Sequence, residues 1–391
     1  MKKILIIWPL GSPIYISNFW RSSLLYEVAA HIRKHGCIVD VFDGLEHQTF
    51  SELFRVLLSE QYESIILHAP LDMMDGFIKT FKYIRLLDPV KPIFIYGLST
   101  LLSPKTFRKM NIQGYSNSGF YEKGILSFLG LDGEYSHCVL KQDGEWREYS
   151  SKRKSPNFWS FMDINDTNKF PVICMTISRG CQGGCNFCRH ALLHGNNDLR
   201  KPIDEVCEYI GQLERFGFSG MIEFASPTFT IDKNWVENFC AEYLKHGFKT
   251  KWRCVTRVDR IDPNIIKNMA SANCVRIGLG VETMSVKEQK ALNKRILKDR
   301  VLEAIQIIQN NGIEVLTYLI SGIEKQQGKN FIDTYNELKR IGANPVVYAL
   351  LRYENLNFED FIETSIAADM CTSSLNAMTD INNYDLLRLI L

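Results

Sequence analysis

The 391-residue sequence predicts an α/β protein with an amino-terminal doubly wound parallel sheet followed by a (β/α)6 part-barrel. Two observations predict this fold class. Short apolar runs alternate with amphipathic stretches in both halves of the chain. The runs are apolar at consecutive positions, as is typical of strands covered on both faces of a parallel sheet. The predicted divisions are residues 1–130, 131–170, 171–350 and 351–391.

The first domain, residues 1–130, has the alternation of a Rossmann-like sheet. Strands are predicted at 4–8, 38–42, 64–68, 93–96 and 113–115, and helices at 19–34, 49–61, 73–87 and 104–110. No G-x-G-x-x-G follows the first strand, so a dinucleotide ligand is not expected. Ligands of such sheets bind beyond the carboxyl ends of the strands. We therefore expect any ligand of this domain at that edge.

The bridge, residues 131–170, loses this rhythm. Val139 to Tyr149 is predicted to form a hairpin that turns at Asp143-Gly144. Residues 150–156 are predicted to be a solvated linker. The linker carries only three consecutive basic residues, so we interpret it as an exposed loop and not a nucleic-acid patch.

In the second domain, residues 171–350, six strand patterns alternate with helix patterns. Strands are predicted at 172–176, 221–225, 252–258, 275–282, 315–321 and 345–350, and helices at 202–216, 233–245, 263–270, 298–310 and 330–340. Parallel barrels place their chemistry at the carboxyl ends of the strands. The tail, 351–391, is predicted to be helical near 358–370 and 384–390 and to close the barrel or contact substrate.

Three cysteines with the spacing C-x3-C-x2-C follow the first strand of this domain: Cys181, Cys185 and Cys188. Soft thiolate ligands select zinc, copper(I) or an iron–sulfur cluster. A structural zinc site needs a fourth ligand, for which His190 or another cysteine is the alternative. Nucleophilic cysteine catalysis would need one thiol beside a base. The other eight cysteines are scattered through apolar elements and are expected to be buried thiols without disulfides.

This spacing, with Phe187 just before the last cysteine, resembles the defining motif of the radical SAM enzymes. The resemblance implies a 4Fe–4S cluster, with three thiolates on three irons and S-adenosylmethionine on the fourth. One electron from the cluster would cleave S-adenosylmethionine to a 5′-deoxyadenosyl radical, which abstracts a substrate hydrogen. Six strands also match the partial TIM barrel of that family.

The resemblance also implies residues that bind S-adenosylmethionine at the strand ends. Glu282 ends the fourth strand in a G-[IV]-E-[ST]-like segment and would accept hydrogen bonds from the ribose or the methionine amine. Arg257, and also Lys294 or Arg295, would bind the carboxylate. Phe187 would lie against the adenine. The alternative for the charged residues is a salt bridge at the barrel rim.

The sequence departs from the family after the second and fifth strands. The usual Gly-Gly-Glu or Asp-Asp is replaced by residues 224–230, where Ser226 or Thr228 would supply hydroxyl groups. The frequent G-x-P-G-E is replaced by residues 322–326. The residue that exchanges a hydrogen with substrate is not identified by the sequence.

The amino-terminal domain resembles the cobalamin-binding domain of a subgroup of these enzymes. The resemblance rests on the Pro9 turn, the strand ending at Asp43, the segment 92–97 and the segment 119–123. The D-x-H-x-x-G loop that supplies a cobalt ligand is absent. Cobalamin binding and an empty scaffold both remain open.

Composition restricts the partners. A formal net charge of +2 gives no global field for nucleic acid or an anionic membrane. No run approaches the length of a membrane span, and no signal peptide is evident, so a cytoplasmic protein is expected. The family implies a reductant such as flavodoxin or ferredoxin and a small-molecule or peptide substrate.

Three functions follow as hypotheses. The first is cobalamin-dependent methyl transfer to an unactivated carbon in small-molecule or natural-product biosynthesis. The second is a radical SAM enzyme without cobalamin, acting as a dehydratase, dehydrogenase, cyclase or epimerase on a sugar- or nucleoside-like metabolite. The third is a zinc-stabilised binding module without turnover. Zinc without acid-labile sulfide would exclude both enzymes.

Overall fold

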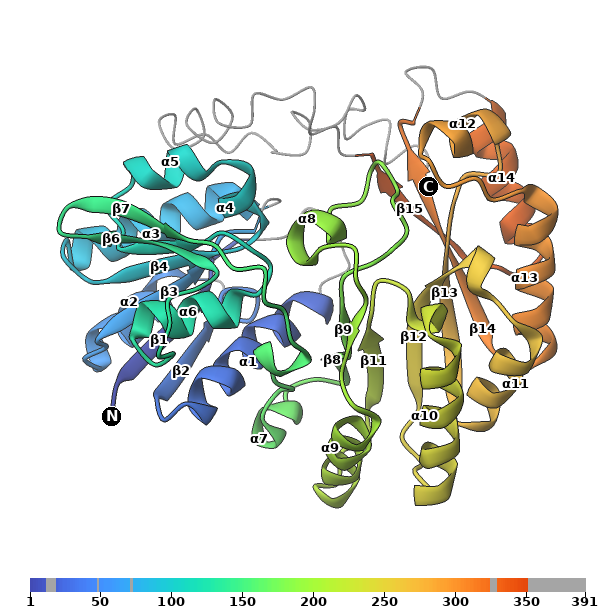
Figure 1. Ribbon diagram of the computed structural model, residues 1–391, viewed down its shortest axis with the longest axis horizontal. Helices are drawn as coiled ribbons and strands as arrows, with labels where there is room; N and C mark the ends of the chain where they lie inside the picture. The colour runs from blue at the N-terminus through green and yellow to red at the C-terminus, as the bar shows by residue number, and fades with distance from the viewer. Residues whose placement is uncertain (12–18, 48, 71–72, 324–328, 351–391) are drawn as a thin grey trace. The chain divides into compact units, whose positions relative to one another are not determined.

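The computed structural model describes residues 1–11, 19–47, 49–70, 73–323 and 329–350 (Figure 1). The chain divides into two compact units, described separately below. Of the described residues, unit 1 contains Met1–Asp163 and the short segment Leu192–His194, and unit 2 contains Ile164–Ala191 and the chain from Gly195 to residue 350. The predicted α/β fold class is confirmed. The helices expected within 351–391 lie outside the described residues.

Unit 1 is built on a seven-stranded sheet in the order β2-β1-β3-β4-β5-β6-β7. The strands are β1 Lys3–Trp8, β2 Ile38–Asp43, β3 Ser64–His68, β4 Ile93–Tyr96, β5 Gly114–Ser116, β6 Cys138–Gln142 and β7 Glu145–Tyr149. Strands β1 to β5 are parallel. Residues 4–7 of β1 are completely buried, as expected for a strand covered on both faces.

The helices of unit 1 lie on both faces of this sheet. They are α1 Phe19–Lys34, α2 Phe50–Ser59, α3 Met74–Leu87, α4 Leu98–Leu102, α5 Pro104–Lys109, α6 Tyr121–Leu129 and the 3-10 helix η2 Pro156–Phe158. Helix α1 contacts α6, while Phe50 and Phe54 of α2 pack against Tyr83 of α3. The order β2-β1-β3 places a topological switch point between β1 and β3, where doubly wound sheets bind ligands.

The hairpin between the halves is formed by β6 and β7. It turns at Asp143 and Gly144, whose φ angles of 53° and 84° suit the tight turn that this dipeptide predicts. Strand β6 pairs antiparallel with β5, so the hairpin extends the amino-terminal sheet. The first compact unit therefore reaches Asp163, beyond the expected end of the first domain at residue 130.

Unit 2 is built on a six-stranded parallel sheet in the order β15-β14-β13-β12-β11-β8. The strands are β8 Val172–Thr176, β11 Met221–Ala225, β12 Trp252–Arg257, β13 Cys274–Glu282, β14 Glu314–Ser321 and β15 Pro345–Ala349. A separate antiparallel pair is formed by β9 Ser178–Arg179 and β10 Leu199–Arg200. Neighbours in this sheet are also neighbours in sequence, as in an open (β/α)6 barrel.

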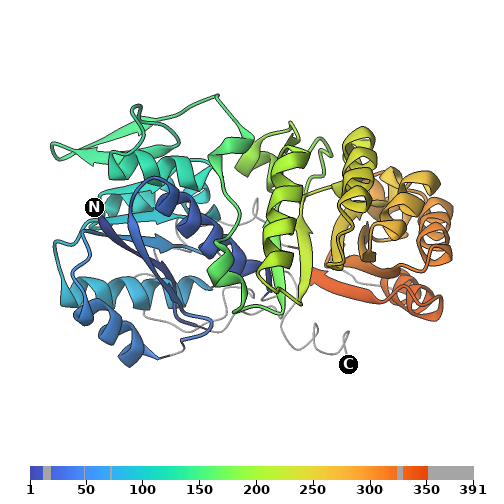
Figure 2. The same cartoon turned by 90° about the horizontal axis from the view of Figure 1, so that it is seen from below.

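The long helices that connect the strands of unit 2 follow one another along the outside of that sheet (Figure 1), and Figure 2 shows them from below. They are α9 Ile203–Arg215, α10 Lys233–His246, α11 Pro263–Ser271, α13 Lys298–Asn310 and α14 Lys329–Arg340. The shorter helices are α7 Ile164–Thr167, α8 His190–His194 (of which Leu192–His194 belong to unit 1), η3 Phe229–Ile231, η4 Val258–Arg260 and α12 Val286–Ala291. Phe224 and Trp252 pack against Phe239 of α10 and fix the helix-covered face. Because side chains alternate along a strand, Ala225 and Arg257 face the barrel interior.

None of the helices within the described ranges has both the length and the apolar character needed to cross a bilayer.

Candidate cofactor site at the carboxyl ends of the unit 2 strands

The cysteine loop begins directly after β8 and β9 and returns to the barrel through β10. Gly180 has a φ angle of +92°, and a Cβ atom there would lie 2.0 Å from the carbonyl oxygen of Asn197. Cys181 N–H donates to the carbonyl of Gly195 at 3.3 Å. These contacts fold the loop back on itself, so that all three cysteines lie at the carboxyl end of the barrel.

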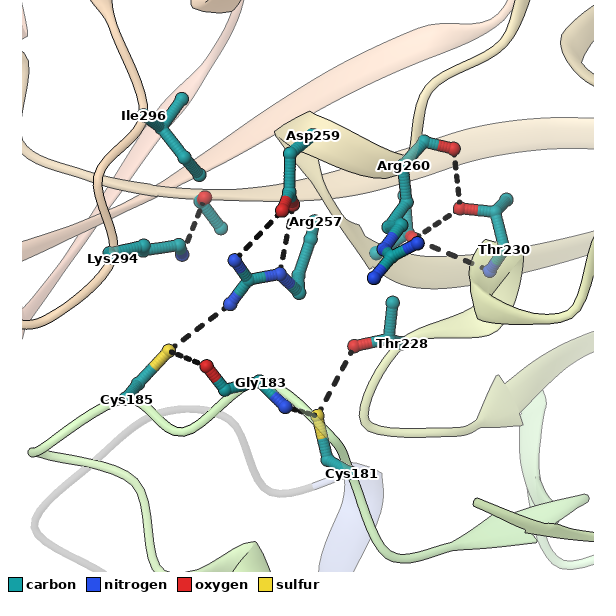
Figure 3. A network of polar contacts seen from close by, with 12 residues as sticks. Cys181, Gly183, Cys185, Thr228, Thr230, Arg257, Asp259, Arg260, Lys294 and Ile296 are labelled. Atoms are coloured by element: carbon teal, nitrogen blue, oxygen red, sulfur yellow. Dashed lines mark hydrogen bonds and ion pairs between the residues drawn. The ribbon is translucent and has the colours of Figure 1, made fainter. Parts of the chain in front are cut away.

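The three cysteines are half-buried free thiols, and two of them, Cys181 and Cys185, flank Gly183. The amide of Gly183 donates to Cys181 Sγ at 3.3 Å. A Cβ atom on Gly183 would lie 3.3 Å from Cys181 Sγ and 3.7 Å from Cys185 Sγ, so two sulfur atoms flank one glycine (Figure 3). Because Gly183 has no side chain, its backbone lies beside these two sulfur atoms without a side chain that would crowd them.

These thiols suit a cluster better than a single ion. Among the described residues, no three Cys, His, Asp or Glu side chains converge closely enough to hold one metal ion. A structural zinc ion needs four ligands at about 2.0–2.3 Å from one point. In an iron–sulfur cluster each thiolate binds a separate iron, so the sulfur atoms need not converge in this way.

Arg257, at the end of β12, lies directly over the cysteine loop. Its Nη1 donates to Cys185 Sγ at 3.2 Å, while Nε and Nη2 donate to the two carboxylate oxygens of Asp259 at 2.9 and 3.0 Å (Figure 3). Burial opposes the charge of the guanidinium, but the hydrogen bonds and charge of Asp259 outweigh it and raise the pKa of Arg257. The structure therefore holds the charged guanidinium of Arg257 beside Cys185 Sγ.

The segment after β11 lies on the other side of the loop. Thr228 Oγ1 is 3.6 Å from Cys181 Sγ (Figure 3), and the Thr228 carbonyl accepts a hydrogen bond from Arg200 Nη2 at 2.9 Å. Ser226 Oγ is 2.7 Å from Ser178 Oγ and braces β9. Sequence reasoning missed Arg200, whose only signal was a basic residue just before a predicted helix.

Glu282 and Lys294 form a buried ion pair at the end of β13. Lys294 Nζ is 2.5 Å from Glu282 Oε1 and donates to the Gly280 carbonyl at 2.7 Å. Their side chains are 10% and 3% exposed. Glu282 has a φ angle of +66°, and the register with β14 shifts between Gly280 and Glu282. Such strain at a strand end is typical of functional sites.

Gly280 makes room for this pair. A Cβ atom there would lie 2.8 Å from both Glu282 Oε1 and Lys294 Nζ. Arg295 follows with a φ angle of +56° and an exposed side chain, so the structure does not bring it into the pair.

The segment around Lys294 is held against the cysteine loop, which sequence reasoning did not predict. Asn186 N–H donates to the Leu292 carbonyl at 3.2 Å. Asn293 Nδ2 donates to the Gly184 carbonyl at 2.9 Å. Phe187, next to Asn186, is half-buried, and its contact with adenine stays a prediction.

A second candidate site lies at the carboxyl edge of the unit 1 sheet. The last residues of β1, β3 and β4 form an aromatic row: the Trp8 and His68 rings stack with centroids 4.3 Å apart, and His68 and Tyr96 lie 4.7 Å apart. Among the described residues, Trp8 Nε1 and the Tyr96 hydroxyl are buried without a hydrogen-bond partner. Burial, and then the charge of Glu122, raises the pKa of Tyr96, so its hydroxyl stays a donor. These two buried donors are the last residues of β1 and β4, at the edge where doubly wound sheets bind ligands.

In a comparison with protein families, residues 175–338 match the Radical SAM superfamily. This range begins within β8 and contains the three cysteines, Arg257 and the Glu282–Lys294 pair.

Two curated relatives match parts of the chain. An uncharacterized methyltransferase of Pyrococcus horikoshii is 23% identical over 181 residues, 46% of this chain and 39% of its own length. The anaerobic magnesium-protoporphyrin IX monomethyl ester cyclase of Rubrivivax gelatinosus is 26% identical over 169 residues, 42% of this chain and 30% of its own length. The matched segments thus span less than half of each relative.

Solved structures match nearly the whole chain. The radical S-adenosylmethionine methyltransferase TsrM from Kitasatospora setae, with cobalamin and a [4Fe-4S] cluster bound, gives a TM-score of 0.72 at 10% identity, covering 92% of this chain and 77% of that one. The cobalamin-dependent S-adenosylmethionine radical enzyme OxsB, with aqua-cobalamin bound, gives 0.71 at 16% identity, covering 97% and 56%. These likenesses show a shared fold. Residues 175–338 are thus similar to the Radical SAM superfamily, and the chain shares the fold of the TsrM and OxsB structures.

Proposed function

We propose that this protein is a cobalamin-dependent radical SAM methyltransferase that acts on an unactivated carbon of a small molecule. The observation that carries the proposal is the pairing of the three-cysteine loop with an amino-terminal sheet whose carboxyl edge holds two buried, unsatisfied donors. The superfamily brings a 4Fe–4S cluster and S-adenosylmethionine. The fold of TsrM and OxsB, whose structures contain cobalamin, supports the third cofactor.

The chain's own residues have separable roles in this proposal. When bound, the cluster and cobalamin supply the electron and the methyl carrier, and the protein supplies orientation and exclusion of water. Cys181, Cys185 and Cys188 would hold the cluster. Glu282, Lys294 and Ser226 would orient S-adenosylmethionine, with Phe187 against its adenine.

The donors of unit 1 would hold cobalamin. Trp8 Nε1 and the Tyr96 hydroxyl would donate to oxygen acceptors of the cofactor from the ends of β1 and β4. Each donor would gain a partner that no described residue provides. Binding of the ligand would therefore relieve the desolvation cost of both groups.

The proposal is tested by anaerobic reconstitution with iron and sulfide, addition of hydroxocobalamin and desalting. We expect the retained protein to carry both the cluster absorbance and about one equivalent of corrin. Methyl-labelled S-adenosylmethionine and a reductant should then yield 5′-deoxyadenosine with transfer of label to the substrate. A cluster without retained corrin would contradict the proposal.

A second function remains a candidate because the D-x-H-x-x-G loop is absent. The enzyme would then be a radical SAM dehydratase, dehydrogenase, cyclase or epimerase, with unit 1 as scaffold. This candidate predicts formation of 5′-deoxyadenosine, no retained corrin and no transfer of label from the methyl group of S-adenosylmethionine.

Tyr96→Phe should weaken cobalamin retention without destabilising the free protein. The Tyr96 hydroxyl has no hydrogen-bond partner among the described residues, so its removal costs the free protein nothing. In the complex it removes one hydrogen bond, which corresponds to about a five- to tenfold rise in the dissociation constant. The measurement is a corrin absorbance titration combined with thermal unfolding of the free protein.

Tyr115→Phe is the matched control, because the Tyr115 hydroxyl already accepts a hydrogen bond from Arg108 Nε at 3.0 Å. It should lower the unfolding temperature slightly and leave the corrin affinity unchanged. Equal corrin affinity in Tyr96→Phe and the wild type would show that the Tyr96 hydroxyl does not bind cobalamin.

Gly180→Ala should lower the iron content of the reconstituted protein. The added Cβ would meet the Asn197 carbonyl at 2.0 Å, and the φ angle of +92° adds backbone strain of about 1–3 kcal/mol. The loop must therefore move, and the cysteines move with it. Iron and sulfide analysis after desalting measures the effect.

Gly217→Ala is the control variant, because it introduces the backbone strain of a positive φ angle without a steric clash. Gly217 has a φ angle of +84°, but a Cβ atom there would meet nothing within 4 Å. This variant should lose stability and keep its iron. If both variants retained full iron content, the packing of Gly180 would not position the cysteines.

A further inference from the structure

We infer that Thr228 and Arg257 set the reduction potential of the cluster by donating hydrogen bonds to two of the sulfur atoms that would bind it. The inference rests on the cluster and on neither cobalamin nor methyl transfer. It assigns these two side chains to the cluster itself, in addition to the predicted contacts with S-adenosylmethionine.

Thr228 is placed as a donor to Cys181. Its Oγ1 lies 3.6 Å from Cys181 Sγ, within reach of a hydrogen bond to sulfur (Figure 3). A thiolate that binds iron has no proton, so the hydroxyl must donate and the sulfur must accept. Thr228 is 1% exposed, so water does not compete strongly for the hydroxyl. Its carbonyl is held by Arg200 Nη2, which fixes the backbone at this position.

Arg257 is placed as a donor to Cys185. Only Nη1 points to sulfur, at 3.2 Å, because Asp259 takes Nε and Nη2 in a bidentate pair. The pair orients the guanidinium plane, as expected for an arginine and a carboxylate. A Cβ atom on Gly183 would lie 3.0 Å from Nη1, so the glycine allows the arginine to approach the loop. The contact therefore depends on Arg257 at the end of β12, on Asp259 in η4 and on Gly183 in the cysteine loop.

Both contacts favour the reduced cluster. Reduction adds negative charge, which spreads onto the cysteine sulfur atoms, and hydrogen-bond donors stabilise that charge. Arg257 adds a positive charge to its hydrogen bond, so its effect should be the larger. The backbone amide of Gly183 donates to Cys181 Sγ as well, but no side-chain substitution removes it.

The test is a potentiometric titration of the reconstituted cluster without cobalamin, substrate or S-adenosylmethionine, read by electron paramagnetic resonance. In Thr228→Val, the ratio of reduced to oxidised cluster at a fixed potential should fall about tenfold, or about 59 mV for a one-electron couple. Thr228→Ser keeps the hydroxyl and should restore the wild-type ratio. In Arg257→Gln the ratio should fall further than in Thr228→Val.

A matched control comes from the same neighbourhood. Thr230 is a buried threonine whose hydroxyl bonds Thr256 Oγ1 at 2.6 Å and the Arg260 carbonyl at 3.0 Å (Figure 3). Thr230→Val should therefore leave the ratio unchanged. An equal shift in Thr230→Val, or a wild-type ratio in both Thr228→Val and Arg257→Gln at full iron content, would overturn the inference.

If Thr228→Val failed to hold iron, the ratio in Arg257→Gln, with Thr228→Ser as its control, would still test whether a donor to a cysteine sulfur sets the reduction potential. A wild-type ratio in Arg257→Gln would then overturn the inference. Loss of corrin binding would disprove the proposed methyl transfer and leave this titration unaffected. The two proposals can therefore fail separately.

Discussion

Replacing Cys181, Cys185 or Cys188 by alanine is expected to abolish formation of 5′-deoxyadenosine from S-adenosylmethionine. Each thiolate would hold a separate iron, and a three-cysteine loop has no spare ligand. The described residues near the loop offer no further group of metal-binding side chains. We expect the turnover of each variant to fall below detection, at least about a thousandfold, because the loss of a cluster removes the electron source altogether.

The matched control is another free cysteine outside the loop. Cys37 is 6% exposed and belongs to unit 1, whereas the cysteine loop belongs to unit 2, so Cys37→Ala should keep both iron and turnover. The measurement combines iron and sulfide analysis with chromatography of the product under a strong reductant. Undiminished 5′-deoxyadenosine from any of the three loop variants would disprove the assignment of the cluster.

Much of the fold could be predicted from the sequence because its signals are local. Continuous apolar runs predicted the parallel strands of both sheets, and the structure contains them within one or two residues. Asp143-Gly144 predicted the hairpin turn. Its pairing with β5 depends on a contact between segments, and no local pattern reports such a contact.

The sequence predicted the candidate site only through one rule, that parallel barrels place their chemistry at the carboxyl ends of their strands. The rule places strand ends together, and it brought Arg257, Thr228 and Glu282 to the edge where the cysteines lie. It could not show that Arg257 divides its donors between Asp259 and Cys185, because that depends on side-chain direction.

The docking of the Lys294 segment on the cysteine loop was also not predictable. It depends on backbone contacts such as Asn186 to Leu292, more than a hundred residues apart in the chain. Left-handed φ angles at Asn293 and Arg295 turn this segment, and neither residue is a glycine that would have signalled the turn. The two buried donors at the edge of the unit 1 sheet were also not predicted, because Trp8 and Tyr96 have the sequence pattern of ordinary strand residues.

Lys294→Met is expected to destabilise unit 2 strongly. The substitution leaves the Glu282 carboxylate buried, 10% exposed, without its cation. Removal of one partner from a buried ion pair typically costs about 3–5 kcal/mol of unfolding free energy. Chemical denaturation of the reconstituted protein should show this loss. Lys233→Met is the control: its partner Asp262 sits in a pair whose lysine is 55% exposed, so that loss should be about 1 kcal/mol or less.

The double variant Glu282→Gln with Lys294→Met separates folding from function. With no buried charge left, most of the lost stability should return, because neutral groups of similar volume replace the pair. If the pair binds S-adenosylmethionine, the double variant should still bind it about tenfold or more weakly, since a hydrogen bond to a charged group is lost. Equilibrium dialysis of the anaerobic, cluster-loaded protein measures this affinity. A stable double variant with wild-type affinity would mean that Glu282 and Lys294 only close the end of β13, and that the cofactor is held by the residues after β11.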